Sequence, residues 1–229
     1  PVARAIAEKL PATLTLAALS LAVSLAIGLP AGLVAAARRQ TAWDYGAMGV
    51  ALFGISVPNF WLGILLILVF SLWLGWLPSM GYVEPWADPV RALRHALLPA
   101  VTLGMILAGV VMRMTRSTLL EELSKEYVRT AEAKGLPRWR VVLVHAQRNA
   151  LIPTLTVVGL QAGYLLGGTV VVEQLFNWPG LGWLLLRAIL ARDYPLVQGI
   201  ILVIACAFVL VNLAVDLGYR ALDPRIRLA

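Results

Sequence analysis

Long apolar runs alternate with short polar segments along this chain of 229 residues. A helix needs about 20 predominantly apolar residues to cross the hydrocarbon core of a bilayer. Runs close to this length or longer predict five membrane-spanning helices, over residues 11–37, 46–74, 95–112, 149–172 and 194–215. The first ten residues form a weakly amphipathic lead-in. The third helix is expected to continue past Arg113 and Arg116 into water.

Two regions depart from this simple alternation. Pro58 lies inside the second run and predicts a kink there, because proline removes a helical hydrogen bond. Residues 75–81, which follow that run, form an interfacial turn flanked by aromatic side chains. Residues 173–195 are expected outside the membrane, with an apolar patch over residues 181–190 that lies along the interface.

Composition assigns the chain to the membrane proteins. It is 60% hydrophobic and 14% charged, with a mean hydropathy of +0.83, whereas soluble domains carry about 25% charged residues. We therefore expect an all-α, polytopic helix bundle that forms one membrane domain. The net charge of +7 is spread through the loops between helices, so it indicates membrane topology and no nucleic-acid partner.

The sequence contains few residues that could form a disulfide, a metal site or a catalytic site. The single cysteine, Cys206, excludes a disulfide within the chain, and His95 and His145 lack the spacing of metal ligands. We expect neither a metal nor a cofactor. The sequence also lacks the G-x-x-x-x-G-K-[ST], H-E-x-x-H and G-x-S-x-G patterns, so no ATP-binding site of its own and no enzymatic activity are expected.

The longest polar interruption, residues 121–153, begins with a short amphipathic helix over residues 126–137. Ser124 is a suitable N-cap, and Glu126 favours the positive end of the helix dipole. Gly135 is expected in the left-handed C′ conformation that ends helices, and Pro137 prevents continuation. Because charged segments between spans are often only solvated, a plain connecting loop is the alternative interpretation.

One face of this helix has the features of a contact surface. Tyr127, Ala131 and Lys134 share that face at positions i, i+4 and i+7. Tyr127 is then an aromatic anchor, and the small alanines allow another protein's backbone to approach closely.

The letters EYVRTAEAKG, followed by HAQRNALIP, resemble the cytoplasmic EAA loop of ABC-importer permeases in the peptide and nickel branch. In that family a coupling helix sits in a groove on an ATPase subunit. The resemblance implies ATPase-coupling residues at Tyr127, Arg129, Ala131, Glu132, Ala133, Gly135 and Leu136. Arg129 and Thr130 replace the Glu and Ala suggested by the name of the motif. The long spacing from Gly135 to Pro153 argues against the sugar-importer branch.

Four further segments carry the same resemblance over the whole chain: LPATLTLA at 10–17, FNWPGLG at 176–182, RDYP at 192–195 and NLAVDLGYRALDPRIR at 212–227. Together they resemble the B-type permease of dipeptide, oligopeptide and nickel importers. The resemblance implies a type I ABC importer transmembrane domain over residues 11–219, in a bacterial inner membrane. It also implies four kinds of partner: a homologous second permease subunit, two cytosolic ATP-binding subunits, an outside solute-binding protein and membrane lipid.

Polar and small residues in the spans suggest where a solute passes. Glycines at 159, 163 and 167 form one stripe on the fourth span, which favours close helix packing. Polar side chains in a membrane are costly unless they face protein or a water-filled path. The candidates for a translocation path are Asn59, Gln161, Tyr164 and Gly168. Interhelical hydrogen bonds are the alternative for these residues, and for Glu173 either contact with an outside partner or no special role is expected.

An ion-coupled secondary transporter is the alternative function. Such a protein needs carboxylates or broken helices near the middle of the membrane, and no Asp or Glu lies in the middle of an expected span. Reconstituted transport with and without the ATPases distinguishes the two functions. Within the importer class, the sequence does not distinguish a dipeptide from a longer peptide or a nickel chelate.

Lysine and arginine placement predicts the orientation. With residues 121–153 inside, the other side holds only six of the 19 basic residues, namely Arg4, Lys9, Arg91, Arg94, Arg187 and Arg192. Five spans then place residues 1–10 outside and the tail, residues 220–229, in the cytoplasm. A family member of this kind has six helices, so a further helix is expected before residue 1.

This orientation is testable with single-cysteine variants made after removal of Cys206. An impermeant thiol reagent applied to intact cells should label Gly81→Cys and leave Gly135→Cys unlabelled, because Gly81 is expected outside and Gly135 inside. The reverse labelling would overturn the predicted topology.

Overall fold

The computed structural model describes residues 1–167 and 169–222, with the backbone alone for residues 216 and 219–222. All regular structure in these ranges is helical, which confirms the all-α prediction. Along the chain the elements are α1 (Val2–Ala37), α2 (Ala42–Ser56), α3 (Asn59–Leu66) with a π-helical continuation Ile67–Trp73, α4 (Pro89–Leu123), α5 (Glu126–Ala133), α6 (Arg138–Arg140) with a π-helical continuation Val141–Ala146, α7 (Gln147–Gly167), α8 (Val170–Leu175), α9 (Leu181–Leu190) and α10 (Tyr194–Leu222).

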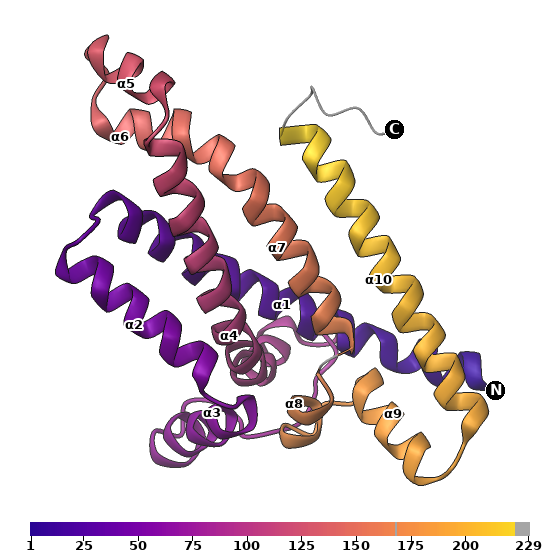
Figure 1. Cartoon of the computed structure of the whole chain (residues 1–229). Helices are drawn as coiled ribbons and strands as arrows, with labels where there is room; N and C mark the ends of the chain where they lie inside the picture. Colours follow the sequence, from indigo (N-terminus) through magenta and orange to yellow (C-terminus); the bar gives the residue numbers. More distant parts are fainter. Residues whose placement is uncertain (168, 223–229) are drawn as a thin grey trace.

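Four helical segments in the described part are long and apolar enough to cross a membrane: Val2–Ala37, Pro89–Leu123, Arg138–Gly167 and Tyr194–Val215. The pair α2 and α3 makes a fifth span if it is counted as one. The long helices run through the bundle, and α5 projects beyond one end of it (Figure 1). This arrangement agrees with the predicted helix bundle.

The second span is not one kinked helix, as predicted, but two helices bent by 105°. Val57 and Pro58 both have extended backbone conformations, with ψ values of 126° and 136°. Proline disfavours the helical conformation of the residue before it and cannot donate a helical hydrogen bond. The chain therefore leaves the helix completely at this point and starts a new one at Asn59.

Several predicted boundaries also need correction. α1 begins at Val2, so the lead-in is the first part of the same helix. The fourth span begins near Arg138 and ends at Gly167, before the separate short helix α8. The third helix extends to Leu123, past Arg113 and Arg116, as expected, and the apolar patch at residues 181–190 is helix α9.

The centre of the fold is the contact between α1 and α4, which is made close by glycines. A Cβ atom at Gly28 of α1 would lie 2.8 Å from the carbonyl oxygen of Ala108. A Cβ at Gly104 of α4 would lie 2.8 Å from the carbonyl oxygen of Ser20. A residue larger than glycine would leave no room for backbones this close. Small residues at helix interfaces in membranes allow this kind of close approach. Leu16 and Leu103 are buried in the apolar core beside this contact.

The glycine stripe on α7 packs against α10. A Cβ at Gly163 would meet the Phe208 ring at 2.4 Å, and a Cβ at Gly159 would meet Val215 at 2.3 Å. Gly167 is less tight, because the nearest side-chain atom would be 3.7 Å away. The structure therefore confirms the predicted packing role of the stripe.

A polar cluster around Glu173 fastens α8 and α9 to α1. The carboxylate is fully buried and accepts hydrogen bonds from Thr13 Oγ1 at 3.1 Å, Thr169 Oγ1 at 2.8 Å and the Trp183 amide at 2.7 Å. Thr13 Oγ1 in turn accepts from the Leu181 amide at 2.7 Å. Burial raises the pKa of the Glu173 carboxyl, against the effect of these donors.

The environment of Glu173 corrects the expectation of an outside contact or a carboxylate without a special role. The Trp178 indole closes the cluster by donating to the Ala12 carbonyl oxygen at 2.9 Å. A Cβ at Gly180 would lie 2.3 Å from Glu173 Oε1, so the loop fits only with glycine there. Glu173 is thus a structural residue that joins segments about 160 residues apart.

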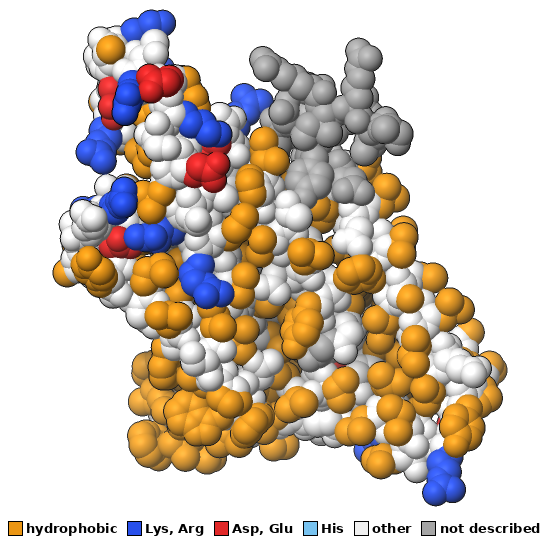
Figure 2. Space-filling view, viewed as in Figure 1, with side chains coloured by type: hydrophobic (Ala, Val, Ile, Leu, Met, Phe, Trp, Pro, Cys, Tyr) orange, Lys and Arg blue, Asp and Glu red, His pale blue; other side chains and the backbone are white. Residues whose placement is uncertain are grey.

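Charged and apolar side chains are unevenly distributed over the surface of the bundle. On the face shown in Figure 2, apolar side chains dominate the middle of the bundle, most charged side chains gather near α5 and the turn between α1 and α2, and a few basic side chains lie at the opposite end. At that turn Arg116 of α4 makes a bidentate ion pair with the buried Asp44 of α2, with N–O distances of 2.6 and 2.8 Å. The pair attaches α2 to α4 at the charged end.

The α7–α10 packing predicts that Gly163→Leu destabilises the protein by about 1–3 kcal/mol, because the new side chain overlaps the Phe208 ring. Thermal unfolding in detergent measures the change. Gly49→Leu is the matched control, since no atom lies within 4 Å of a Cβ at that position. Equal melting temperatures for both variants and the parent would contradict the packing role.

The Glu173 cluster generates a second prediction. Glu173→Leu removes the acceptor of a buried backbone amide and two hydroxyl groups. Each buried group left unsatisfied costs about 1–3 kcal/mol, so we expect the melting temperature in detergent to fall by several degrees. Glu173→Gln keeps one carbonyl oxygen for the Trp183 amide and should lose much less. Equal losses for the two variants would show that hydrogen bonding is not what Glu173 contributes.

Candidate functional site

The helix α5 ends as its sequence predicts. Gly135 has a φ of +78°, in the left-handed region. The Gly135 amide donates to the Glu132 carbonyl oxygen at 2.9 Å, and the Leu136 amide donates to the Ala131 carbonyl oxygen at 3.3 Å. These two bonds are those of the Schellman motif, which satisfies the last carbonyl groups of a helix. The end of α5 therefore has one defined shape that depends on glycine.

The predicted N-cap of α5 is wrong. Lys125, which has extended backbone angles, occupies the N-cap position, and no side chain caps the helix. Ser124 Oγ donates instead to the Glu121 carbonyl oxygen at 2.7 Å. Since α4 extends as far as Leu123, Ser124 belongs to the end of α4 and not to the start of α5.

Tyr127 joins α5 to two of the long helices. Its hydroxyl donates to Glu122 Oε2 of α4 at 2.8 Å and accepts from Asn149 Nδ2 of α7 at 3.4 Å. Burial and the Glu122 carboxylate raise the pKa of the Tyr127 hydroxyl, so it remains a neutral donor at physiological pH. Glu122 also pairs with Lys125. The Tyr127 hydroxyl thus contacts the bundle while the residue stays 37% exposed, and its predicted role as an aromatic anchor in coupling stays a prediction.

The other predicted coupling residues divide by exposure. Ala131 and Leu136 are half-buried, and the exposed ones are Arg129, Glu132, Ala133 and Gly135. Arg129 pairs with Glu126 at 3.0 Å on the surface. Val128, which the sequence analysis did not single out, is the buried residue of α5. Val128 is the only aliphatic side chain larger than alanine between Tyr127 and Leu136, and this was the available signal.

Three of the four predicted path residues line one cavity of about 190 Å³. Asn59 is the first residue of α3, directly after the sharp bend, and Gln161 and Tyr164 come from α7. Apolar residues of α4, among them Leu103 and Leu107, form another wall. Gly168 lies outside the described residues. The cavity combines amide and phenol groups, which both donate and accept hydrogen bonds, with an apolar surround.

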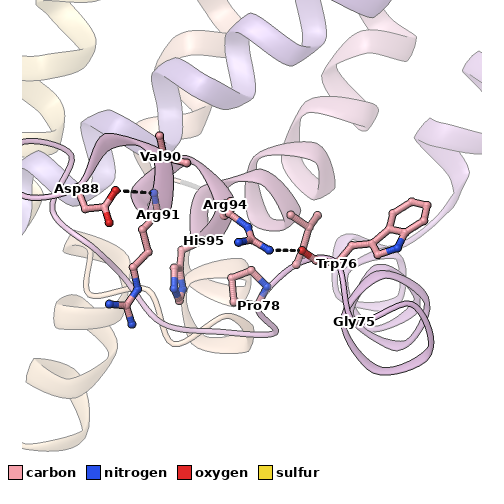
Figure 3. A pocket seen from close by; sticks show the side chains of 9 residues that line it. Gly75, Trp76, Pro78, Asp88, Val90, Arg91, Arg94 and His95 are labelled. Atoms are coloured by element: carbon pink, nitrogen blue, oxygen red, sulfur yellow. Dashed lines mark hydrogen bonds between the residues drawn. The ribbon is translucent and has the colours of Figure 1, made fainter.

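A second polar pocket, of about 510 Å³, lies at the other end of α4 from α5 (Figure 3). The first two turns of α4 contribute Arg91, Arg94 and His95, and the facing turn contains Trp76. Arg94 Nη2 donates to the Trp76 carbonyl oxygen at 2.8 Å, which holds this side chain against the turn. The Arg91 and His95 side chains project to the same side of the helix (Figure 3). Asp88 lines the same pocket, so this end of the bundle presents a pocket with two arginines and one carboxylate, which leaves it net basic.

Comparison with known proteins agrees with this geometry. Residues 28–228 match the family described as binding-protein-dependent transport system inner membrane component. The di/tripeptide transport system permease protein DppB of Pseudomonas aeruginosa is 47% identical, over 95% of this chain and 70% of the relative. The glutathione transport system permease protein GsiC of Escherichia coli is also 47% identical, over 99% of this chain and 72% of the relative.

A relative in Brucella abortus, whose name assigns it to a peptide transport system as a permease, is 48% identical over 99% of this chain and 72% of its own length. The fold matches a solved inward-facing structure of the MetNI methionine ABC transporter, with a TM-score of 0.78, 18% identity and 96% of both chains covered. The chain therefore belongs to the inner membrane component family of binding-protein-dependent transport systems, the multi-pass permease subunits of ABC importers.

Proposed function

We propose that this chain is the permease subunit of an importer for short peptides or peptide-derived solutes. The relatives named for di/tripeptide and glutathione transport, each 47% identical, support this substrate class. A nickel chelate is the other solute considered for this branch. Partner ATPases drive transport, a second permease subunit completes the path, and a solute-binding protein delivers the solute.

The observation that carries the proposal is the attachment of α5 to both long helices that wall the cavity. The Tyr127 hydroxyl forms hydrogen bonds with Glu122 on α4 and Asn149 on α7. The same α4 supplies Leu103, and the same α7 supplies Gln161, to the cavity. A displacement of α5 by a docked ATPase is thus passed to both walls at once. The exposed residues of α5 are then the contact with the ATPase.

The cavity at Asn59, Gln161 and Tyr164 is the proposed contact for the solute. Peptide bonds carry a donor and an acceptor each, and the amide side chains of Asn59 and Gln161 can pair with both. The sharp bend before Asn59 brings its side chain to the same cavity as α7. Apolar walls leave these few polar groups to orient the solute.

The orientation follows from the same proposal. The ATPases bind the α5 end, which is cytoplasmic, and the N-terminal end of α1 is outside, as the placement of basic residues predicts. The binding protein then docks at the other end of the bundle. The pocket of Arg91, Arg94 and His95 at that end offers positive charge to an acidic docking surface.

Coupling is tested with Gly135→Val and Ala131→Arg. A β-branched residue at a φ of +78° costs about 1 kcal/mol or more, so the Schellman end of α5 is reshaped while the spans remain intact. An arginine at the half-buried Ala131 adds bulk and charge to the docking face. In the reconstituted complex we expect ATP hydrolysis stimulated by the binding protein, and transport, to fall severalfold in both variants.

Gly49→Val is the matched control for a glycine substitution, because its position on α2 is open and far along the chain from α5. Its hydrolysis and transport should equal those of the parent. Parental hydrolysis and transport in both α5 variants would show that α5 is only a connector. Transport that persists without ATPases and follows an ion gradient would instead support a secondary transporter.

A further inference from the structure

An apolar groove of about 620 Å³ opens between α1, α2 and α4. Its walls include Val34 of α1, Val50 of α2 and Met112 of α4, and Val34 and Val50 are both about half exposed. The bottom of the groove is formed where α2 and α4 approach through Gly109, whose Cβ would lie 2.7 Å from the Ala51 carbonyl oxygen. Apolar side chains dominate the lining, so the groove suits a hydrocarbon chain.

One end of the groove is basic. Trp43 lines the groove and is largely exposed, and the Arg38 guanidinium lies 5.5 Å from the centre of its ring. Arg39 is exposed beside Arg38 in the same turn. Tryptophan beside arginine at the end of an apolar surface is typical of the level of lipid headgroups.

The positive charge at this end is only partly offset within the described part of the chain, since Asp44 is the carboxylate that feels both Arg116 and, more weakly, Arg39. The nearby Asp44 carboxylate accepts two hydrogen bonds from Arg116 and one from the backbone amide of Gln40. Among the described residues, neither Arg38 nor Arg39 lies within 4.0 Å of a carboxylate oxygen. Two cations therefore remain available to an anion beside an apolar groove.

The basic end lies on the side of the membrane where α5 projects. Ala36, two residues before Arg38, packs in one apolar cluster with Leu119 and Val142. Leu119 lies near the end of α4, seven residues before α5 begins, and Val142 follows α5 in the chain. Figure 1 shows the turn between α1 and α2 at the same end of the bundle as α5. An anion at Arg38 and Arg39 is thus at the surface of the leaflet nearest α5.

We propose that this groove is a binding site for one anionic phospholipid of that leaflet. An acyl chain lies along the apolar walls, and the headgroup phosphate contacts the guanidinium groups of Arg38 and Arg39. Basic pockets between membrane helices bind anionic headgroups through the same charge complementarity. The bound lipid covers apolar surface on α1, α2 and α4 together, and so holds α2 against the central pair of helices.

The experiment uses native mass spectrometry of the purified importer complex, titrated with phosphatidylglycerol or with phosphatidylcholine. We expect the parent to retain phosphatidylglycerol in clear preference to phosphatidylcholine. Arg38→Gln combined with Arg39→Gln should weaken phosphatidylglycerol binding about tenfold and phosphatidylcholine binding much less, because the choline ammonium already offsets the phosphate charge of that lipid. Gly46→Leu should weaken the binding of both lipids by filling the groove.

Two features of the chain make the test selective. No atom lies within 4 Å of a Cβ at Gly46, so the leucine enters open space and the fold is retained. Arg187→Gln is the control for the loss of an arginine, since the Arg187 guanidinium also lies over a tryptophan ring, at 3.7 Å from Trp183, but outside this groove. It should leave phosphatidylglycerol binding unchanged.

Two results would overturn the proposal. One is phosphatidylglycerol binding that is the same in the parent, the double arginine variant and Gly46→Leu. The other is efficient crosslinking of Gly46→Cys to the second permease subunit in the complex, which would show that protein, and not lipid, covers the groove.

Discussion

The close contact of α1 with α4 is the constraint on which the other elements depend. Lipid tails are as apolar as leucine, so helices in a membrane gain little from apolar surface alone and associate through close packing and polar bonds. Gly28 and Gly104 allow that packing at the centre. The remaining elements are then attached to this pair by specific contacts: α2 by the ion pair of Asp44 with Arg116, and the α8–α9 segment by the bonds of Glu173 to Thr13 and Trp183.

The same framework also fixes the position of the small helix α5 outside the bundle. α5 has only eight residues, and an isolated helix of that length is not stable in water. Its shape comes from the buried Val128, from the Schellman end at Gly135 and from the bonds of Tyr127. Because the Tyr127 hydroxyl forms hydrogen bonds to both α4 and α7, α5 is held on the two helices that also line the polar cavity, α4 with its middle part and α7 with its C-terminal part.

Sequence reasoning succeeded where the relevant signal is local. The left-handed Gly135, the long apolar helices and the glycine stripe on α7 are each written in a few neighbouring residues, and all three are present in the structure. It failed where the partner lies far along the chain. Glu173 and Thr13 are 160 residues apart, so no spacing rule connects them. The 105° bend was underestimated, because Pro58 alone indicates a break without its angle.

Ser124 and Tyr127 illustrate the same limit at short range. Ser124 was assigned to the wrong helix because the end of α4 was not visible in the apolar pattern, which stops well before Leu123. The direction of Tyr127 depends on Asn149, which is 22 residues away and returns to α5 only after the turn at α6. Asn59, Gln161 and Tyr164 do line one cavity, because polar side chains in an apolar span tend to face protein or water, but their role in a translocation path stays a prediction.

The two ways of attaching helices also differ in what they permit mechanically. The contact of α7 with α10 places glycine backbone against the methyl groups of Val215 and the ring of Phe208, a smooth surface without directional bonds at those positions. The Glu173 cluster, in contrast, holds α8 and α9 on α1 through bonds of fixed length and angle. Packed helices of the first kind can slide by small shear steps, whereas hydrogen-bonded clusters move as one piece. The α8–α9 end of the bundle is therefore held in a fixed position, whereas the contact of α7 with α10 has no hydrogen bonds at Gly159 and Gly163 that would oppose a small sliding step.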